Sequence, residues 1–177
     1  RNSFMIHNQA KKVMKKILLL SDTHSYSDDR ILHYAEQADE VWHAGDIGDL
    51  KVTDALKKIK PLKAVYGNID DAEARKEFPL DNVFMCENKK VWITHIGGYP
   101  GKYPARIKEG FALHKPDIFI CGHSHILKVQ FDKQFNCLDL NPGAAGIYGF
   151  HQMRTMLRFE IDKDKIENLE VIELGKR

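Results

Sequence analysis

Short apolar runs alternate with stretches of helical periodicity in the first half of the chain. The run Ile17–Leu20 predicts a buried strand, and the next stretch carries Ile31 and Ala35 at helical spacing behind the capping candidate Asp28. The same alternation continues in three further segments, a strand at 40–43, a helix at 49–60 and a strand at 62–66. Strands that alternate with helices favour parallel pairing through right-handed crossovers.

The second half of the chain is richer in strand patterns. Strands at 83–86 and 91–94 are separated by Glu87–Lys90 and predict a hairpin. A helix at 103–114 and a strand at 118–121 follow. Four further strands are expected to be antiparallel, at 127–131, 135–140, 155–161 and 166–172. The predicted fold class is therefore α/β, with mixed sheets packed face to face as a sandwich and helices on the outside.

The chain length favours one domain. At 177 residues, with no repeat or low-complexity linker, the chain is long enough to bury a substantial core. The sequence begins at Arg1 rather than Met, and we expect folding to begin near Met14. Residues 1–13, which include His7, are interpreted as a tag remnant or N-terminal extension, and residues 14–177 as a single domain.

Charge and cysteine content exclude several classes of protein. The 27 basic and 25 acidic residues leave a formal charge of +2, too small to indicate a nucleic-acid or membrane surface. No stretch approaches the roughly 18 apolar residues of a membrane span, and no secretory signal pattern is present. The three cysteines lack metal or disulfide spacing and are expected to be reduced and buried. We therefore expect a cytoplasmic protein without a membrane partner, for which nucleic acid is at most a substrate.

Potential metal ligands follow five of the predicted strands. They stand in the segments SDTH, HAGD, GNID, THIGG and CGHSH. Open α/β sheets bind ligands beyond the carboxyl ends of their strands, so these side chains are expected at one edge. His123 and His125 are one residue apart and would point to the same side of an extended chain. A lone histidine is often structural, but two converging imidazoles suggest a metal ion.

The ordered motifs D-x-H, G-D-x-x-D, G-N-x-D, H and G-H-x-H resemble the signature of the calcineurin-like metallophosphoesterases. The segment NPGAAG at 141–146 is similar to the N-P-G turn of their small bacterial and archaeal phosphodiesterase branch, whose fold the retromer scaffold subunit shares. The resemblance covers residues 15–172 and implies a β-sandwich of two mixed sheets flanked by helices.

This resemblance implies two divalent metal ions. The ligands implied for the first ion are Asp22, His24, Asp46 and His125. Those implied for the second ion are Asp46 as a bridge, Asn68, His95 and His123. The mixture of oxygen and imidazole ligands suits Mn, Ni, Fe, Zn or Co, among which we favour manganese. Together with a bridging hydroxide, such a centre keeps a net positive charge of about +1 for an anionic phosphate.

Other residues acquire expected roles from the same resemblance. Asp46, Asn68 and His95 are the predicted catalytic residues. Asp49 and Asp70 are expected to orient the ligands, with a capping or turn role as the alternative.

Two departures from the family pattern bear on the substrate. Ile69 replaces the histidine that protonates the leaving group in the phosphomonoesterase branch, and Leu50 replaces an arginine that clamps a dianionic phosphate. A site without either group suits a monoanionic diester with a good leaving group. The motif at His95 reads HIGG, and the loop at Tyr99–Gly101 is interpreted either as a lid over the site or as an ordinary loop.

The predicted function is therefore a metal-dependent phosphodiesterase acting on a small phosphodiester, with a homo-oligomer expected by analogy. A phosphatase acting on small monoesters and a non-catalytic interaction scaffold are the alternatives. Among the remaining histidines, His33, His114 and His151 are expected to be solvated or to pack. For His43, support of a ligand and packing at a strand end both stay open.

Overall fold

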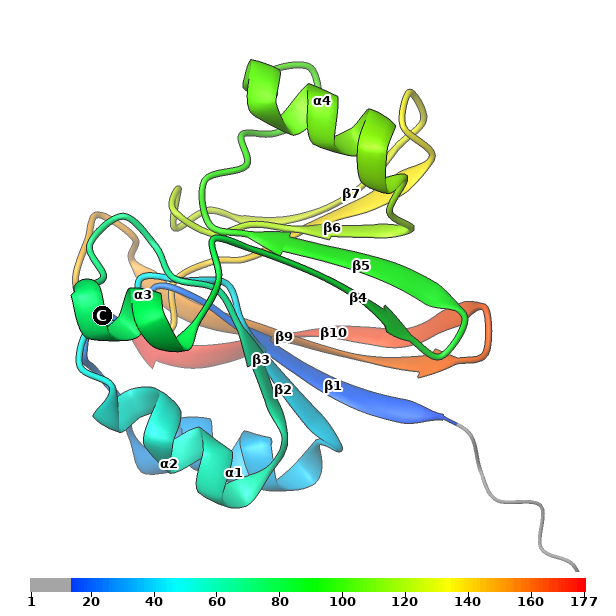
Figure 1. Cartoon of the computed structure of the whole chain (residues 1–177). Helices are drawn as coiled ribbons and strands as arrows, with labels where there is room; N and C mark the ends of the chain where they lie inside the picture. Colours follow the sequence, from blue (N-terminus) through cyan, green and yellow to red (C-terminus); the bar gives the residue numbers. More distant parts are fainter. Residues whose placement is uncertain (1–13) are drawn as a thin grey trace, which may run out of the picture.

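The computed structural model describes residues 14–177, so the expected extension at 1–13 lies outside the described residues. Two five-stranded mixed sheets pack face to face with helices on their outer sides (Figure 1). This is the α/β sandwich expected from the sequence.

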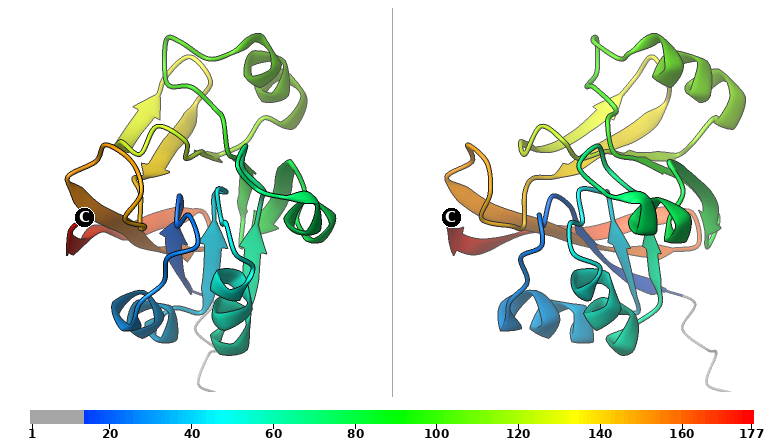
Figure 2. Two further views of the ribbon diagram at one scale, coloured as in Figure 1. Left: turned by 90° about the vertical axis from the view of Figure 1, so that its left-hand side faces the viewer. Right: turned by 60° about the vertical axis from the view of Figure 1, so that its left-hand side comes forward.

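The first sheet has the order β10-β9-β1-β2-β3. Its strands are β1 (Lys15–Leu20), β2 (Glu40–His43), β3 (Leu62–Ala64), β9 (Met153–Asp162) and β10 (Lys165–Lys176). β1 pairs parallel to β2 and β2 to β3, whereas β9 runs antiparallel to both β1 and β10. Helices α1 (Asp29–Gln37) and α2 (Lys51–Ile59) lie on the face turned away from the second sheet (Figure 2).

The second sheet has the order β4-β5-β6-β8-β7. Its strands are β4 (Asp81–Cys86), β5 (Lys89–Thr94), β6 (Ile118–Ile120), β7 (Leu127–Asp132) and β8 (Cys137–Pro142). Helix α4 (Ala105–His114) covers its outer face, where Ile107 and Phe111 pack with Trp92 and Phe119. The helices thus close the two outer faces of the sandwich.

The main core lies between the sheets. Ile17 and Leu19 of β1 belong to the same buried cluster as Val91 and Ile93 of β5. Successive strand side chains point to opposite faces, so Leu18 and Leu20 instead pack against the helices. Two apolar faces on one strand explain why β1 is a continuous hydrophobic run.

Two features differ from the sequence-based expectation. The helix α3 (Ala72–Glu77) was not predicted, because its six residues bury only Ala74 and so show no apolar period. Its signal was the N-cap Asp71, whose side chain accepts from the Ala74 N–H. The other difference is that β8 is antiparallel to β7 but parallel to β6, which places it inside the second sheet.

The cysteine expectation agrees with the structure, since Cys86, Cys121 and Cys137 are all buried and unpaired. Burial raises the pKa of the Cys86 thiol to about 11, which makes it a poor nucleophile at neutral pH. Within residues 14–177, no helix has the length and apolar character needed to cross a bilayer.

Candidate functional site

The candidate ligands follow strands of both sheets and meet at one edge of the sandwich. They form two groups, of which the first contains Asp22, His24 and His125 and the second Asp46, His95 and His123. In each group the potential ligand atoms lie within 4.8 Å of one another. The groups adjoin, because His24 Nε2 lies 3.4 Å from Asp46 Oδ2 and His95 Nε2 lies 3.9 Å from Asp22 Oδ1.

The first group is built around a fully buried carboxylate. Asp22 Oδ2 accepts from Ser21 Oγ at 2.6 Å and from the His123 backbone N–H at 3.1 Å. These bonds leave Oδ1 facing His125 Nε2 at 3.1 Å and His24 Nε2 at 3.8 Å. Three potential ligand atoms therefore converge from the ends of β1 and β6.

The second group is oriented largely by its backbone surroundings. His95 Nδ1 lies 2.7 Å from the Ala44 carbonyl, which can only accept, so Nδ1 carries the proton. In the neutral ring, Nε2 then turns its lone pair toward Asp46 Oδ2, 3.2 Å away. Asn68 joins this group, since its Oδ1 lies 3.0 Å from His123 Nδ1.

Several polar atoms at this site are buried and have no hydrogen-bond partner among residues 14–177. They are Asp22 Oδ1, His24 Nε2 and His95 Nε2. Native structures rarely leave such atoms unsatisfied, and carboxylate oxygens with imidazole nitrogens are ligands for divalent metals. The donor set therefore fits a metal ion at each group.

Electrostatics favour ionised carboxylates here. Burial raises the pKa of Asp22, but the His125 and His24 rings outweigh it and hold that pKa well below its usual range. Asp46 behaves in the same way, with burial opposed by His95. For His95, burial lowers the pKa, but Asp46 and Asp22 raise it more, so a cation would compete with a proton for Nε2.

The ligand loops have unusual backbone geometry. Positive φ angles of 43–68° occur at five of the seven candidate ligands, namely Asp22, His24, Asp46, His123 and His125. Such angles in non-glycine residues store strain of about 1–3 kcal/mol each and cluster at functional sites. The strained turns therefore support the interpretation of this edge as functional.

Asp70 holds two of these loops together. Its buried carboxylate accepts from the backbone N–H groups of Ile47 and Gly48, at 3.1 and 2.8 Å, and of Gly67 at 2.7 Å. It thereby joins the loop of Asp46 to that of Asn68. Asp49 is exposed and its Oδ1 instead accepts from the Lys51 N–H at 2.9 Å, which is the capping role that the sequence left open.

Asn141, the first residue of NPGAAG, supports the loop that carries His123 and His125. Its side-chain amide donates to the Gly122 carbonyl at 2.9 Å and to Ser124 Oγ at 3.1 Å. The motif had signalled this turn, but its contact with the histidine loop depends on the parallel pairing of β6 with β8.

His43 is a buried residue that contacts two of the loops that carry the candidate ligands. It is fully buried, its Nδ1 accepts from the Gly45 N–H at 3.1 Å, and its Nε2 donates to Thr23 Oγ1 at 3.0 Å. Burial lowers its pKa to about 4, so the ring is neutral at pH 7. The ring therefore joins the loops that follow β1 and β2.

The three other histidines behave differently from one another. His33 pairs with Gln37 on the surface of α1, and His114 packs edge-on against Trp92. His151 packs edge-on against the His125 ring, within the role expected from the sequence, and its Nδ1 also lies 3.3 Å from His125 Nδ1, a contact that the sequence did not indicate. Burial lowers the pKa of His151, which favours the neutral ring.

A cavity of about 590 Å³ opens over the candidate ligands. Its remaining wall is largely apolar and contains Ile69, Ile126, Tyr148 and Phe150. Within the described part of the chain, none of the residues lining this cavity is a lysine or an arginine. Leu50 contributes nothing to it, since it packs with Ile47 in a core cluster.

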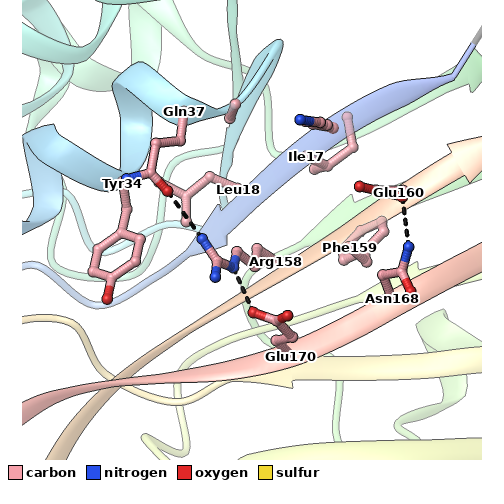
Figure 3. Close-up of a pocket in the computed structure, with 11 residues that line it drawn as sticks. Ile17, Leu18, Tyr34, Gln37, Arg158, Phe159, Glu160, Asn168 and Glu170 are labelled. Atoms are coloured by element: carbon pink, nitrogen blue, oxygen red, sulfur yellow. Dashed lines mark hydrogen bonds and ion pairs between the residues drawn. The ribbon is translucent and has the colours of Figure 1, made fainter.

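Of two other cavities, one adjoins the candidate ligands and the other does not. One of about 450 Å³ includes Tyr99 and shares His123 and Ile126 with the first, so the Tyr99 loop lies beside the ligands. Another of about 500 Å³ lies between α1, β1, β9 and β10, where Arg158 contacts Gln37 and Glu170 (Figure 3). It contains none of the candidate ligands.

Known proteins resemble this chain in sequence and in fold. A probable metallophosphoesterase of Methanocaldococcus jannaschii is 24% identical over 155 residues, which cover 84% of this chain and 77% of that protein. An archaeal phosphodiesterase has a TM-score of 0.66 at 22% identity, over 90% of this chain and 99% of that one. Zinc-complexed Vps29 of Entamoeba histolytica has a TM-score of 0.69 at 18% identity, over 90% and 98%.

A family model agrees with these similarities. The model of the calcineurin-like phosphoesterase superfamily domain matches residues 14–164, which include both ligand groups. The chain therefore belongs to the calcineurin-like phosphoesterase superfamily, a family of metal-dependent enzymes that hydrolyse phosphate esters.

Proposed function

We propose that this protein is a phosphodiesterase with two divalent metal ions, held by the two adjoining groups. The observation that carries the proposal is a set of buried ligand atoms, beneath an open cavity, that have no hydrogen-bond partner in the described part of the chain. Asp46 would help to hold both ions, because its Oδ2 lies within 3.4 Å of both His24 Nε2 and His95 Nε2. Manganese is the metal we favour, although the related Vps29 fold was found with zinc.

Divalent ions held here would supply a water of lowered pKa and positive charge for the phosphate oxygens. The residues themselves orient and hold the ions. Asn68 adds a ligand oxygen without adding negative charge, which preserves the attraction for an anionic substrate.

The cavity lining supports a diester over a monoester. A monoester phosphate is dianionic near neutral pH and is usually clamped by arginine or lysine, and none of the described residues that line this cavity is either, although Arg75 and Arg106 line a neighbouring cavity that shares Asn68. Ile69 lines the cavity but has no proton to donate. The substrate that fits is a monoanionic diester whose leaving group is stable as an anion.

A non-catalytic interaction scaffold is the second candidate. Phe150 is fully exposed and Tyr148 is 68% exposed beside the cavity, and apolar side chains of this kind often mark interfaces. Similarity to Vps29 favours the same candidate. The retention of all seven candidate ligands favours the enzyme.

The test compares two aryl esters with the same leaving group. With added Mn²⁺, we expect kcat/KM for bis-p-nitrophenyl phosphate to exceed that for p-nitrophenyl phosphate by at least about 10-fold. Asp46→Asn should lower the diester rate by about 100-fold or more, since loss of the carboxylate charge weakens the binding of ions that would supply several kcal/mol of charge stabilisation.

Asp49→Asn is the matched control, because Asp49 is exposed and caps a turn, and this variant should keep the parent rate. A preference for the monoester would favour a phosphatase. Metal binding without hydrolysis of either ester would favour the scaffold.

A further inference from the structure

His151 connects the protein backbone to one candidate metal ligand. Its Nε2 lies 2.8 Å from the Gly146 carbonyl oxygen, and its Nδ1 lies 3.3 Å from His125 Nδ1. The two rings are nearly perpendicular, at 75°, with centroids 5.2 Å apart. His151 thus lies between the Gly146 carbonyl oxygen, which accepts a hydrogen bond, and the His125 ring, whose Nε2 faces Asp22.

The carbonyl determines where the protons lie. A carbonyl oxygen only accepts, so His151 Nε2 carries a proton and donates it to Gly146. In a neutral imidazole the other nitrogen is then an acceptor, so the proton in the contact between the two rings belongs to His125 Nδ1. His125 Nε2 therefore keeps its lone pair, and this atom lies 3.1 Å from Asp22 Oδ1.

We propose that His151 is a positioning residue that fixes His125 in the Nδ1–H tautomer and so makes Nε2 available to a divalent cation. The inference rests on the metal site proposed above. The opposite tautomer would point an N–H at the cation and could not ligate it. Partners that fix a ligand histidine in this way typically change metal affinity 10–100-fold when removed.

The second ligand group reaches the same result with a backbone partner. His95 donates its Nδ1 proton directly to the Ala44 carbonyl at 2.7 Å. The Nδ1 of His125 is instead directed at Nδ1 of the His151 ring. That ring in turn donates a hydrogen bond from Nε2 to the Gly146 carbonyl. His95 and His125 therefore present the same nitrogen, Nε2, through different hydrogen-bond partners.

The chain near His151 is shaped to allow this contact. Gly149 has φ +129°, and a side chain there would collide with the His125 ring at Nδ1 and Cε1. The absence of a side chain lets the segment pass close to His125 and places His151 alongside it. A ring that merely filled space would not require its two nitrogens to align with a donor and an acceptor.

The experiment replaces His151 with two residues of different hydrogen-bonding capacity. His151→Leu removes the acceptor, whereas His151→Asn keeps an oxygen near the position of Nδ1. Mn²⁺ binding is measured by titration calorimetry on the metal-stripped full chain, together with the unfolding temperature with and without Mn²⁺. His33→Leu is the control, because His33 contacts Gln37 on the surface of α1.

We expect the parent and His33→Leu to bind two ions, and His151→Leu to bind one of the two about 10–100-fold more weakly. His151→Asn should recover most of that loss. The metal-free unfolding temperatures should agree within a few degrees, which separates lost ligation from lost folding. If His151→Leu binds both ions as the parent does, or if Asn gives no recovery, the inference is wrong while the metal site stands. If the parent binds no ion, the proposed function fails and the inference with it.

Discussion

The side chain of Ile69 has no proton to donate, at the position where the family resemblance places a general acid in the phosphomonoesterase branch. It is 46% exposed and lines the cavity over the candidate ligands. Its backbone N–H donates to Asp46 Oδ1 at 3.1 Å, so the position is anchored to a ligand. An imidazole introduced there would start from a fixed backbone near the phosphate.

We therefore predict that Ile69→His raises kcat/KM for diesters with poor leaving groups by about 10-fold or more, because general-acid catalysis contributes 10²–10⁴-fold when well placed. The parent rate should fall steeply as the leaving-group pKa rises. The measurement is kcat/KM over a series of diesters with graded leaving groups. Ile126→His is the control, since it adds the same ring to another part of the cavity wall. A flat dependence in the parent would mean that another group already donates the proton.

Strands β7 and β8 are joined to the segment before α4 by one hydroxyl. Tyr103 Oη lies 2.9 Å from Asp132 Oδ2 and 2.7 Å from Asp139 Oδ2, and it has a single proton for these two carboxylates. Burial raises the pKa of Asp139 to about 6, although its bond with Tyr103 lowers it. Its other oxygen, Oδ1, is buried without a partner among the described residues.

The sign of the resulting pH dependence follows from this raised pKa. The folded state holds the Asp139 proton more tightly than the unfolded chain, so the stabilisation is complete below about pH 4 and is lost as the pH rises through 6. Asp139→Asn, which is always neutral, should therefore raise the free energy of unfolding more at pH 8 than at pH 4. The expected difference is about 2 kcal/mol.

Urea unfolding of parent and variant at both pH values measures this difference. Asp164→Asn, at an exposed turn, should leave the parent pH dependence unchanged. Parallel pH profiles for parent and Asp139→Asn would contradict the prediction.

The two sheets meet at the ligand groups. The loops after β1 and β2 supply Asp22, His24 and Asp46, and the second sheet supplies the other three histidines. Each group therefore contains residues from both sheets, and an ion bound to either would link the two halves of the sandwich. Without a cation, Asp22 and Asp46 repel each other in a buried setting.

Removal of metal should therefore destabilise the whole molecule. A chelator should lower the unfolding temperature by about 5–10 °C relative to protein with Mn²⁺ at 100 times its dissociation constant, because such binding adds about 2.7 kcal/mol. Scanning calorimetry with and without chelator measures the shift, and renewed Mn²⁺ should reverse it. Asp46→Asn should show a smaller shift than Asp49→Asn. Equal unfolding temperatures with chelator and with Mn²⁺ would argue against ions that join the sheets.

The sequence was sufficient for the fold class and for most elements. Runs such as Ile17–Leu20 predicted strands because burial on both faces demands continuous apolar residues. Helix α3 was not predicted, because six residues with one buried side chain show no hydrophobic periodicity. The parallel pairing of β8 with β6 was missed because strand order depends on contacts between segments that periodicity does not relate.

The candidate ligands themselves could also be identified from the sequence, because each motif is local and the carboxyl ends of parallel strands share one edge. Their supports could not. Asp22 accepts from the backbone of His123 across 101 residues, and His125 meets His151 across 26. Spacing along the chain determines which way a side chain points from its own strand, but the distance between two loops depends on how the sheets pack. For that reason the candidate ligands could be identified from the sequence. The tautomer of His125 and the role of His151 depend on contacts that only the tertiary structure creates.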